Sequence, residues 1–138
     1  MILLDTSGVI AALAPNQRYH EEAAAALLAA EPPLILSPFV LAEIDYLLMK
    51  LASADAALRF LEEVARGAYL LAVFDSSNVA RVCEIAVRYR EVGIADASIV
   101  VLAELFHTRD VLTLDERHFR AFRLDRNKRF RILPADRR

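Results

Sequence analysis

A chain of 138 residues has the length of one domain, and its composition, 57% hydrophobic and 26% charged, provides enough apolar side chains for a buried core. This composition excludes a disordered chain, and no apolar run reaches the roughly 20 residues that span a bilayer. The first residues lack the basic start of a signal peptide, and a single cysteine, Cys83, excludes an internal disulfide and a cysteine-based metal site. We therefore expect one domain, residues 1–138, of a cytoplasmic protein that does not enter a membrane.

Charge is distributed unevenly along the chain. The net charge is −2, but residues 107–138 carry ten Lys and Arg against five acids, which gives +5. Residues 1–106 carry seven Lys and Arg against fourteen acids, which gives −7. An acidic body beside a basic tail suits a site that holds cations and admits a phosphate backbone. A solvated basic face without a partner would explain the charge equally well.

The chain opens on a strand that ends at an acid. Residues 2–4 are apolar without interruption, which is typical of a central strand covered on both faces, and Asp5, Thr6 and Ser7 follow directly. Ligands of open parallel sheets bind at the carboxyl ends of the strands. A lone Asp5 would more often cap the next helix, so other acids must converge on it before it indicates chemistry.

The middle of the chain alternates helices and strands. The expected elements are helices over 7–14 and 18–30, a strand over 34–36, a helix from 38 with Ser37 as its N-cap, a helix over 55–66, a strand over 69–74 and a helix from about 76 to 90. In the helix from residue 38, helical spacing predicts a core-facing stripe of Leu41, Ile44, Leu48 and Leu51. Glu43 lies early in that helix and can reach the carboxyl edge of the sheet, although alone it reads as an ordinary exposed acid.

The last third of the sequence adds two more acids. Residues 94–103 are apolar nearly all round, which predicts a buried helix in which Asp96 needs a partner or a cation. A strand over 110–114 ends at Asp115 and repeats the opening combination of strand, hydroxyl and acid, and residues 129–133 predict an edge strand. The alternation predicts an α/β fold with a mostly parallel central sheet of four to five strands flanked by helices.

Four acids are therefore expected at one edge of the sheet: Asp5, Glu43, Asp96 and Asp115. Crowded carboxylates repel one another unless divalent cations lie between them, and oxygen ligands favour Mg²⁺ or Mn²⁺. Such ions catalyse in-line displacement at phosphorus, which indicates phosphodiester hydrolysis. None of the three histidines has a paired metal spacing, so the sequence assigns no ligand or base to His20, His107 or His118.

Four segments, L-L-D-T-S, S-P-F-V-L-A-E-I-D-Y-L-L, I-A-D-A-S-I-V and L-T-L-D-E-R-H-F, resemble the acidic motifs of PIN-domain ribonucleases. The second and fourth particularly resemble those of the VapC toxins of toxin–antitoxin pairs, and the resemblance runs from Met1 to about Phe119. It implies a PIN-like fold and a metal-dependent endoribonuclease that uses Mg²⁺ or Mn²⁺. Its metal ligands and catalytic acids would be Asp5 and Asp96, with Glu43 and Asp115 holding water or a second ion.

The resemblance also implies supporting groups and partners. Thr6 and Thr113 would be supporting hydroxyls, whereas Ser98, where some PIN nucleases carry a further acid, leaves a second metal site open. An RNA substrate, a cognate antitoxin and a homodimer are the implied partners. The candidates for RNA-backbone contacts are Arg117, Arg120 and Arg123.

The candidates for the antitoxin surface are Tyr46, Leu47 and Met49, apolar residues left outside the core-facing stripe of their helix. A dimer interface would explain part of this set equally well.

Other readings of the motifs are a housekeeping or RNA-processing PIN nuclease and a non-catalytic PIN-like module that binds RNA or protein. A haloacid-dehalogenase-like phosphatase is disfavoured, because Ser7 stands where its second acid is needed.

Overall fold

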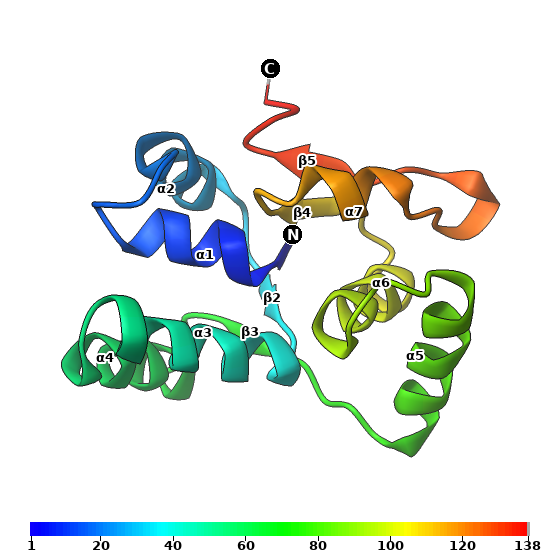
Figure 1. Cartoon of the computed structure of the whole chain (residues 1–138), viewed down its shortest axis with the longest axis horizontal. Coiled ribbons are helices and arrows are strands. Elements are labelled where there is room, and N and C mark those ends of the chain that lie inside the picture. The colour runs from blue at the N-terminus through cyan, green and yellow to red at the C-terminus, as the bar shows by residue number, and fades with distance from the viewer. Residues whose placement is uncertain (138) are drawn as a thin grey trace.

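A parallel sheet forms the centre of the molecule in the computed structural model, which describes residues 1–137 (Figure 1). Its strands are β1 (Ile2–Leu4), β2 (Leu34–Leu36), β3 (Leu70–Leu71), β4 (Asp110–Leu112) and β5 (Arg131–Leu133). They lie in the order β3-β2-β1-β4-β5, and every pairing is parallel. The predicted α/β fold with four to five mostly parallel strands is thus confirmed. The carboxyl ends of β1 and β4, which precede two of the predicted acids, lie side by side.

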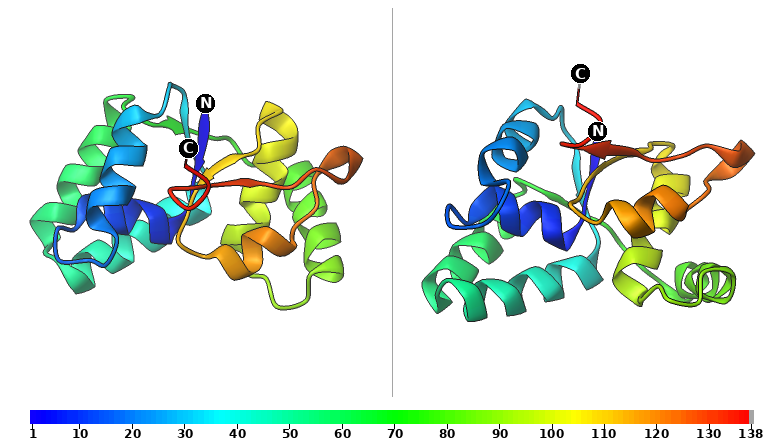
Figure 2. Two further views of the ribbon diagram at one scale, coloured as in Figure 1. Left: turned by 90° about the horizontal axis from the view of Figure 1, so that it is seen from above. Right: turned by 45° about the horizontal axis from the view of Figure 1, so that its top comes forward.

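Seven α-helices and a short 3₁₀ helix surround the sheet within residues 1–137. They are α1 (Thr6–Leu13), α2 (His20–Ala29), α3 (Pro38–Leu51), α4 (Ala54–Ala65), α5 (Ser76–Arg88), α6 (Ile94–Phe106), α7 (Glu116–Ala121) and the 3₁₀ helix η1 (Asp125–Asn127). Neighbouring helices pack in pairs, α3 with α4 and α5 with α6. These two pairs lie on opposite sides of the molecule (Figure 2). Among the described residues, every helix falls short of the length and hydrophobicity that a membrane crossing requires.

The helix ends follow local sequence signals. Ser37 accepts a hydrogen bond from the backbone N–H of Phe39, with Pro38 in the first turn, as predicted for the start of α3. Ser53 caps α4 in the same way, and Asp75 forms a reciprocal capping box with Asn78 at the start of α5. Short-range hydrogen bonds therefore mark the starts of these helices.

One close approach brings α1 onto the end of β4. A Cβ at Gly8 would clash with the backbone carbonyl of Leu112, so only glycine lets the first turn of α1 lie there. The backbone N–H of Asp5 donates to the same carbonyl at 3.0 Å. These contacts hold Asp5 against the carboxyl end of β4.

Two predictions about the helices and strands need correction. The strand expected over 69–74 is only Leu70–Leu71, because β3 is an edge strand whose single neighbour, β2, is three residues long. The stripe predicted on α3 is partly wrong: Ile44 and Leu48 are buried, Leu41 is half-buried and Leu51 is 47% exposed. Val40 joins the buried set instead, so the helix meets the core along a narrow i, i+4 line that ends before its last residue.

Candidate metal centre

Asp5 is the most buried of the four predicted acids, with 4% of its surface exposed. Its Oδ2 accepts hydrogen bonds from the hydroxyl of Thr113 at 2.6 Å and from that of Ser7 at 2.8 Å. Burial raises the pKa of Asp5, and these two hydrogen bonds oppose that effect by favouring the charged form. The hydroxyls therefore fix the carboxylate in a place where charge is costly unless a cation balances it.

Glu43 reaches the same region from α3. The hydroxyl of Thr6, the first residue of α1, donates to Glu43 Oε1 at 2.7 Å. Thr6 is buried while Glu43 is exposed, so the hydroxyl anchors the carboxylate at the mouth of the site. The predicted supporting hydroxyls, Thr6 and Thr113, thus contact two different acids.

Asp96 lies in the first turn of α6 with a side chain 22% exposed. Desolvation, the largest cause, and the charges of Asp5 and Asp115 together raise its pKa to about 7, with a smaller contribution from Glu43. His118 acts in the opposite direction. All three other predicted acids therefore lie near enough to Asp96 to disfavour its charge.

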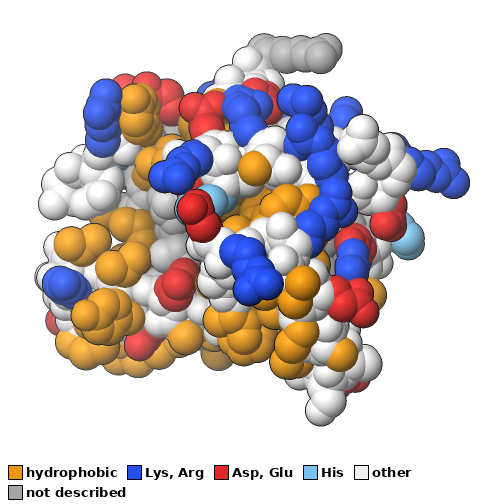
Figure 3. Space-filling view, turned by 45° about the vertical axis from the view of Figure 1, so that its right-hand side comes forward, with side chains coloured by type: hydrophobic (Ala, Val, Ile, Leu, Met, Phe, Trp, Pro, Cys, Tyr) orange, Lys and Arg blue, Asp and Glu red, His pale blue; other side chains and the backbone are white. Residues whose placement is uncertain are grey.

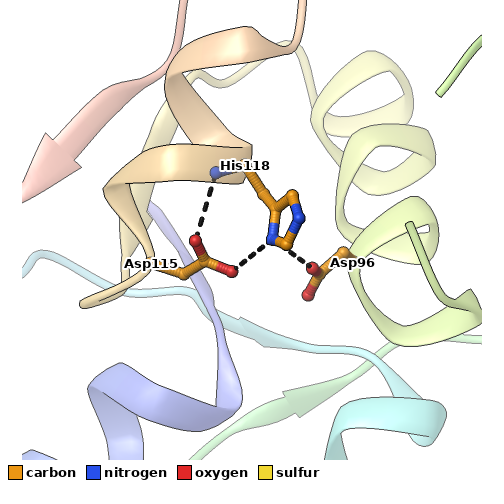
Figure 4. A group of neighbouring side chains, drawn as sticks. All are labelled: Asp96, Asp115 and His118. Atoms are coloured by element: carbon orange, nitrogen blue, oxygen red, sulfur yellow. Dashed lines mark hydrogen bonds and ion pairs between the residues drawn. The ribbon is translucent and has the colours of Figure 1, made fainter. Parts of the chain in front are cut away.

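Asp115 and His118 form a pair at the start of α7, opposite Asp96 (Figure 4). Asp115 Oδ2 lies 2.7 Å from His118 Nδ1, and Asp115 Oδ1 accepts the backbone N–H of His118 at 3.1 Å. His118 Nδ1 is 4.0 Å from Asp96 Oδ2. The hydrogen bond to Asp115 raises the pKa of His118 and favours its protonated form.

His118 is the site residue that the sequence prediction missed. One ligand atom from each of Asp96, Asp115 and His118 lies within 4.8 Å of the others, so the three could share one cation. The available signal was the Asp-x-x-His spacing, which places both side chains on the first turn of a helix. A search for paired histidines alone could not find it.

Ser98 joins the two helices that carry Glu43 and Asp96. It is fully buried, its Oγ lies 2.7 Å from that of Ser37, and it donates to the carbonyl of Ala95. Position 98 thus ties the start of α6 to the cap of α3. In this chain the position where some PIN nucleases carry a further acid has a structural hydrogen bond.

The three predicted arginines are largely engaged within the protein. Arg120 pairs with Glu116 and Asp136, and Arg123 donates to the last carbonyls of α7. Arg117 is 81% exposed and forms one long ion pair with Glu91 at 3.4 Å. Of the three, Arg117 therefore has the charge most accessible to a ligand.

This fold and this set of acids define a class of protein: residues 2–136 match the PIN domain family, and the chain belongs to that family. The chain is 36% identical to Ribonuclease VapC26 of Mycobacterium tuberculosis (strain H37Rv), over 96% of this chain and 100% of that protein. Within the PIN family it is thus a homologue of the VapC ribonucleases, and the predicted ribonuclease activity of VapC type is confirmed at the level of the family.

A solved structure supports the fold independently. The crystal structure of Mycobacterium tuberculosis VapC20, a sarcin-ricin loop cleaving toxin, matches with a TM-score of 0.78 at 19% identity. The match covers 85% of this chain and 92% of that one. At this identity the likeness establishes the shared fold.

Proposed function

We propose that the protein is the endoribonuclease toxin of a toxin–antitoxin pair and that Asp5, Glu43, Asp96 and Asp115 hold its divalent cation. The observation that supports this most strongly is Asp96, whose pKa is raised to about 7 by burial and by the other three acids. Such crowding of carboxylates is costly without a cation and is typical of sites built to bind one. A cation held there supplies Lewis-acid stabilisation of the phosphodiester during hydrolysis.

The remaining side chains of the site orient these acids. Thr113 and Ser7 hold Asp5, Thr6 holds Glu43, and His118 holds Asp115. Hydrogen-bonded partners of this kind fix the direction of ligand oxygens. Removing one commonly lowers metal affinity about tenfold or more. The hydrogen bond to Asp115 raises the pKa of His118, and when His118 is protonated its charge offsets part of the negative charge of Asp115 and Asp96.

The donor atoms favour Mg²⁺ or Mn²⁺ as the cation. Four carboxylates supply oxygen, and the Nδ1 of His118 is occupied by Asp115. Hard oxygen ligands suit these two ions, whereas Zn²⁺ prefers nitrogen and sulfur.

Cleavage of labelled RNA by the purified protein tests the proposal. We expect cleavage in Mg²⁺ or Mn²⁺, none in EDTA, and a loss of at least about 100-fold in Asp5→Asn, as is common when a catalytic electrostatic group is removed. Asp55→Asn, an exposed acid in the first turn of α4, is the matched control and should cleave normally. Normal cleavage by Asp5→Asn would remove this acid from the mechanism.

For the antitoxin we propose a docking surface over α3 and α4. Tyr46 is 63% exposed, Met49 56% and Leu51 47%, and Leu58 and Leu61 of α4 are also exposed. An open groove of about 490 Å³ lies between the ends of α1 and α3 and the start of α4, lined partly by Leu48, Leu51 and Phe60. Leu51 belongs both to the exposed apolar set and to the groove, and exposed apolar side chains beside a groove suit an amphipathic partner segment.

The same surface leads toward the acids through Glu43 on α3. An arginine of the antitoxin directed at the carboxylates would neutralise them through charge-assisted hydrogen bonds and compete with the cation. Leu47 is half-buried against the core, so its contribution to the surface is smaller than the sequence predicted. We also propose that the protein forms a homodimer in which a second copy of the chain covers part of this apolar surface.

A further inference from the structure

The loop between α7 and β5 is a basic projection whose two ends are buried aromatic residues. This basic loop, residues 123–129, contains four Lys and Arg and one acid, Asp125, and extends away from the helices and sheet (Figure 2). Phe122 and Phe130 stand at its two ends, both buried, and each packs edge-on against Phe119 with ring centroids 5.4 Å apart. The backbone N–H of Leu124 donates to the carbonyl of Lys128 at 2.8 Å and closes the loop.

The tip of the basic loop has a backbone conformation that arginine does not favour. Arg126 has φ 58° and ψ 30°, and Asn127 has φ 60°, so two successive residues are left-handed. Turns with two left-handed residues select Asn and Gly, which makes Arg126 a poor choice for the turn itself. Strained residues of this kind are typical of functional positions.

The charges of the basic loop are available to a ligand. Within residues 1–137, the charged groups of Arg126, Lys128 and Arg129 form no ion pair or side-chain hydrogen bond, unlike those of Arg120 and Arg123. All three side chains belong to exposed residues. Lys and Arg side chains form a band across this face of the molecule (Figure 3).

An open hollow of about 540 Å³ lies between the basic loop and the end of α6. Arg109, Arg126 and Lys128 line it, together with His107 and Thr108. Of its two acids, Glu104 has both oxygens bonded to Arg81, which leaves only Asp125. The volume falls within the range of about 300–1,000 Å³ for small-ligand sites, which is enough for one nucleotide.

We propose that the basic loop and this hollow bind the phosphate backbone of the RNA at a point remote from the bond that is cut. The inference rests on the proposed function. Asp115 of the candidate metal centre begins α7, and α7 leads directly into the basic loop, so an RNA whose phosphate lies at the acids can continue along α7 to this second contact. Exposed Lys and Arg side chains that are spread over a surface recognise a polyanionic backbone by its charge and not by its base sequence.

RNA binding is measured in EDTA with proteins that all carry Asp5→Asn, so that cleavage does not interfere. The test variant is Arg126→Ala/Lys128→Ala/Arg129→Ala, and the control is Lys50→Ala/Arg59→Ala/Arg66→Ala, which removes the same charge from exposed positions of α3 and α4 and the residue that follows α4. The probe is a fluorescent RNA stem-loop.

We expect the loop variant to bind the stem-loop about 10- to 100-fold more weakly. The slope of log K against the logarithm of the salt concentration should become less steep by about 2. The control variant should bind the stem-loop within about twofold of the Asp5→Asn protein, because the side chains that it removes are not part of the proposed phosphate contacts. Arg126→Gly should lose affinity while its melting temperature stays level or rises, because glycine removes the strain of the turn.

Equal losses in the loop variant and the control, or no loss in either, would overturn the inference. So would a loop variant that keeps full RNA affinity but escapes its co-expressed antitoxin, because the surface would then serve a protein partner. Failure of the proposed function is recognised separately: a wild-type protein that binds the stem-loop through the basic loop but never cleaves it supports this contact and contradicts the nuclease assignment.

Discussion

Replacing Asp96 by Asn should stabilise the metal-free protein. Burial and the neighbouring acids raise the pKa of Asp96 from 3.8 to about 7. At about 1.4 kcal/mol for each unit of pKa, this corresponds to about 4 kcal/mol as an upper limit for the cost of the charged form in the folded state. Asparagine has nearly the same shape without the charge, so we expect a gain of about 2–4 kcal/mol in the free energy of unfolding at about pH 8.

The pH dependence has a defined sign. A folded-state pKa above the unfolded value means that the folded protein binds the proton more tightly, so stability is highest at low pH and is lost as pH rises from about 4 to about 7. Asp96→Asn has no carboxyl group at this position, so it does not lose stability in this way as the pH rises. Its advantage over the wild type should therefore shrink to about 1–2 kcal/mol at about pH 5.

Urea unfolding of both proteins in EDTA at these two pH values measures the effect. Asp55→Asn is the control, and it should lose about 0.5 kcal/mol because the acid lies in the first turn of α4. A wild type as stable as Asp96→Asn at about pH 8, or an equal difference at both pH values, would show that Asp96 is not crowded by other charges.

Three further predictions concern the cation, the packing and the partner. Mg²⁺ or Mn²⁺ should raise the melting temperature of EDTA-treated protein, by an amount equivalent to about 2.7 kcal/mol at 100 times Kd, and Zn²⁺ should do so less; no shift with any ion would leave the acids structural. Gly8→Ala should destabilise by about 1–3 kcal/mol in a denaturant titration, because its Cβ meets the carbonyl of Leu112, although this substitution in an ordinary helix is stabilising; a gain would contradict the close packing. Met49→Glu should weaken inhibition by the co-expressed antitoxin and leave cleavage intact in its absence; full inhibition together with loss of a dimer would assign the surface to self-association.

The strands and acids could be predicted because their signals are local. Residues 2–4 and the strand from Asp110 are short, mostly apolar runs with a carboxylate and a hydroxyl within three residues of their carboxyl ends, and a parallel sheet places such ends at one edge. The cap Ser37 was predictable for the same reason, since its side chain accepts a hydrogen bond from a backbone N–H two residues away.

The long-range contacts of the site could not be predicted, because they join residues far apart in sequence. Thr113 contacts Asp5 across 108 positions, and Thr6 contacts Glu43 across 37. The engagement of Arg120 with Asp136 likewise depends on how the chain turns after α7. Composition therefore indicated a basic tail without showing which of its charges are already paired.

The site itself is tested most directly by locating Mn²⁺ in crystals through its anomalous scattering. The proposal predicts a peak among the carboxylates of Asp5, Asp96 and Asp115, with Glu43 at its edge, and its loss in crystals of Asp5→Asn. A peak elsewhere on the molecule, or one that persists undiminished in Asp5→Asn, would contradict a metal centre built from these acids.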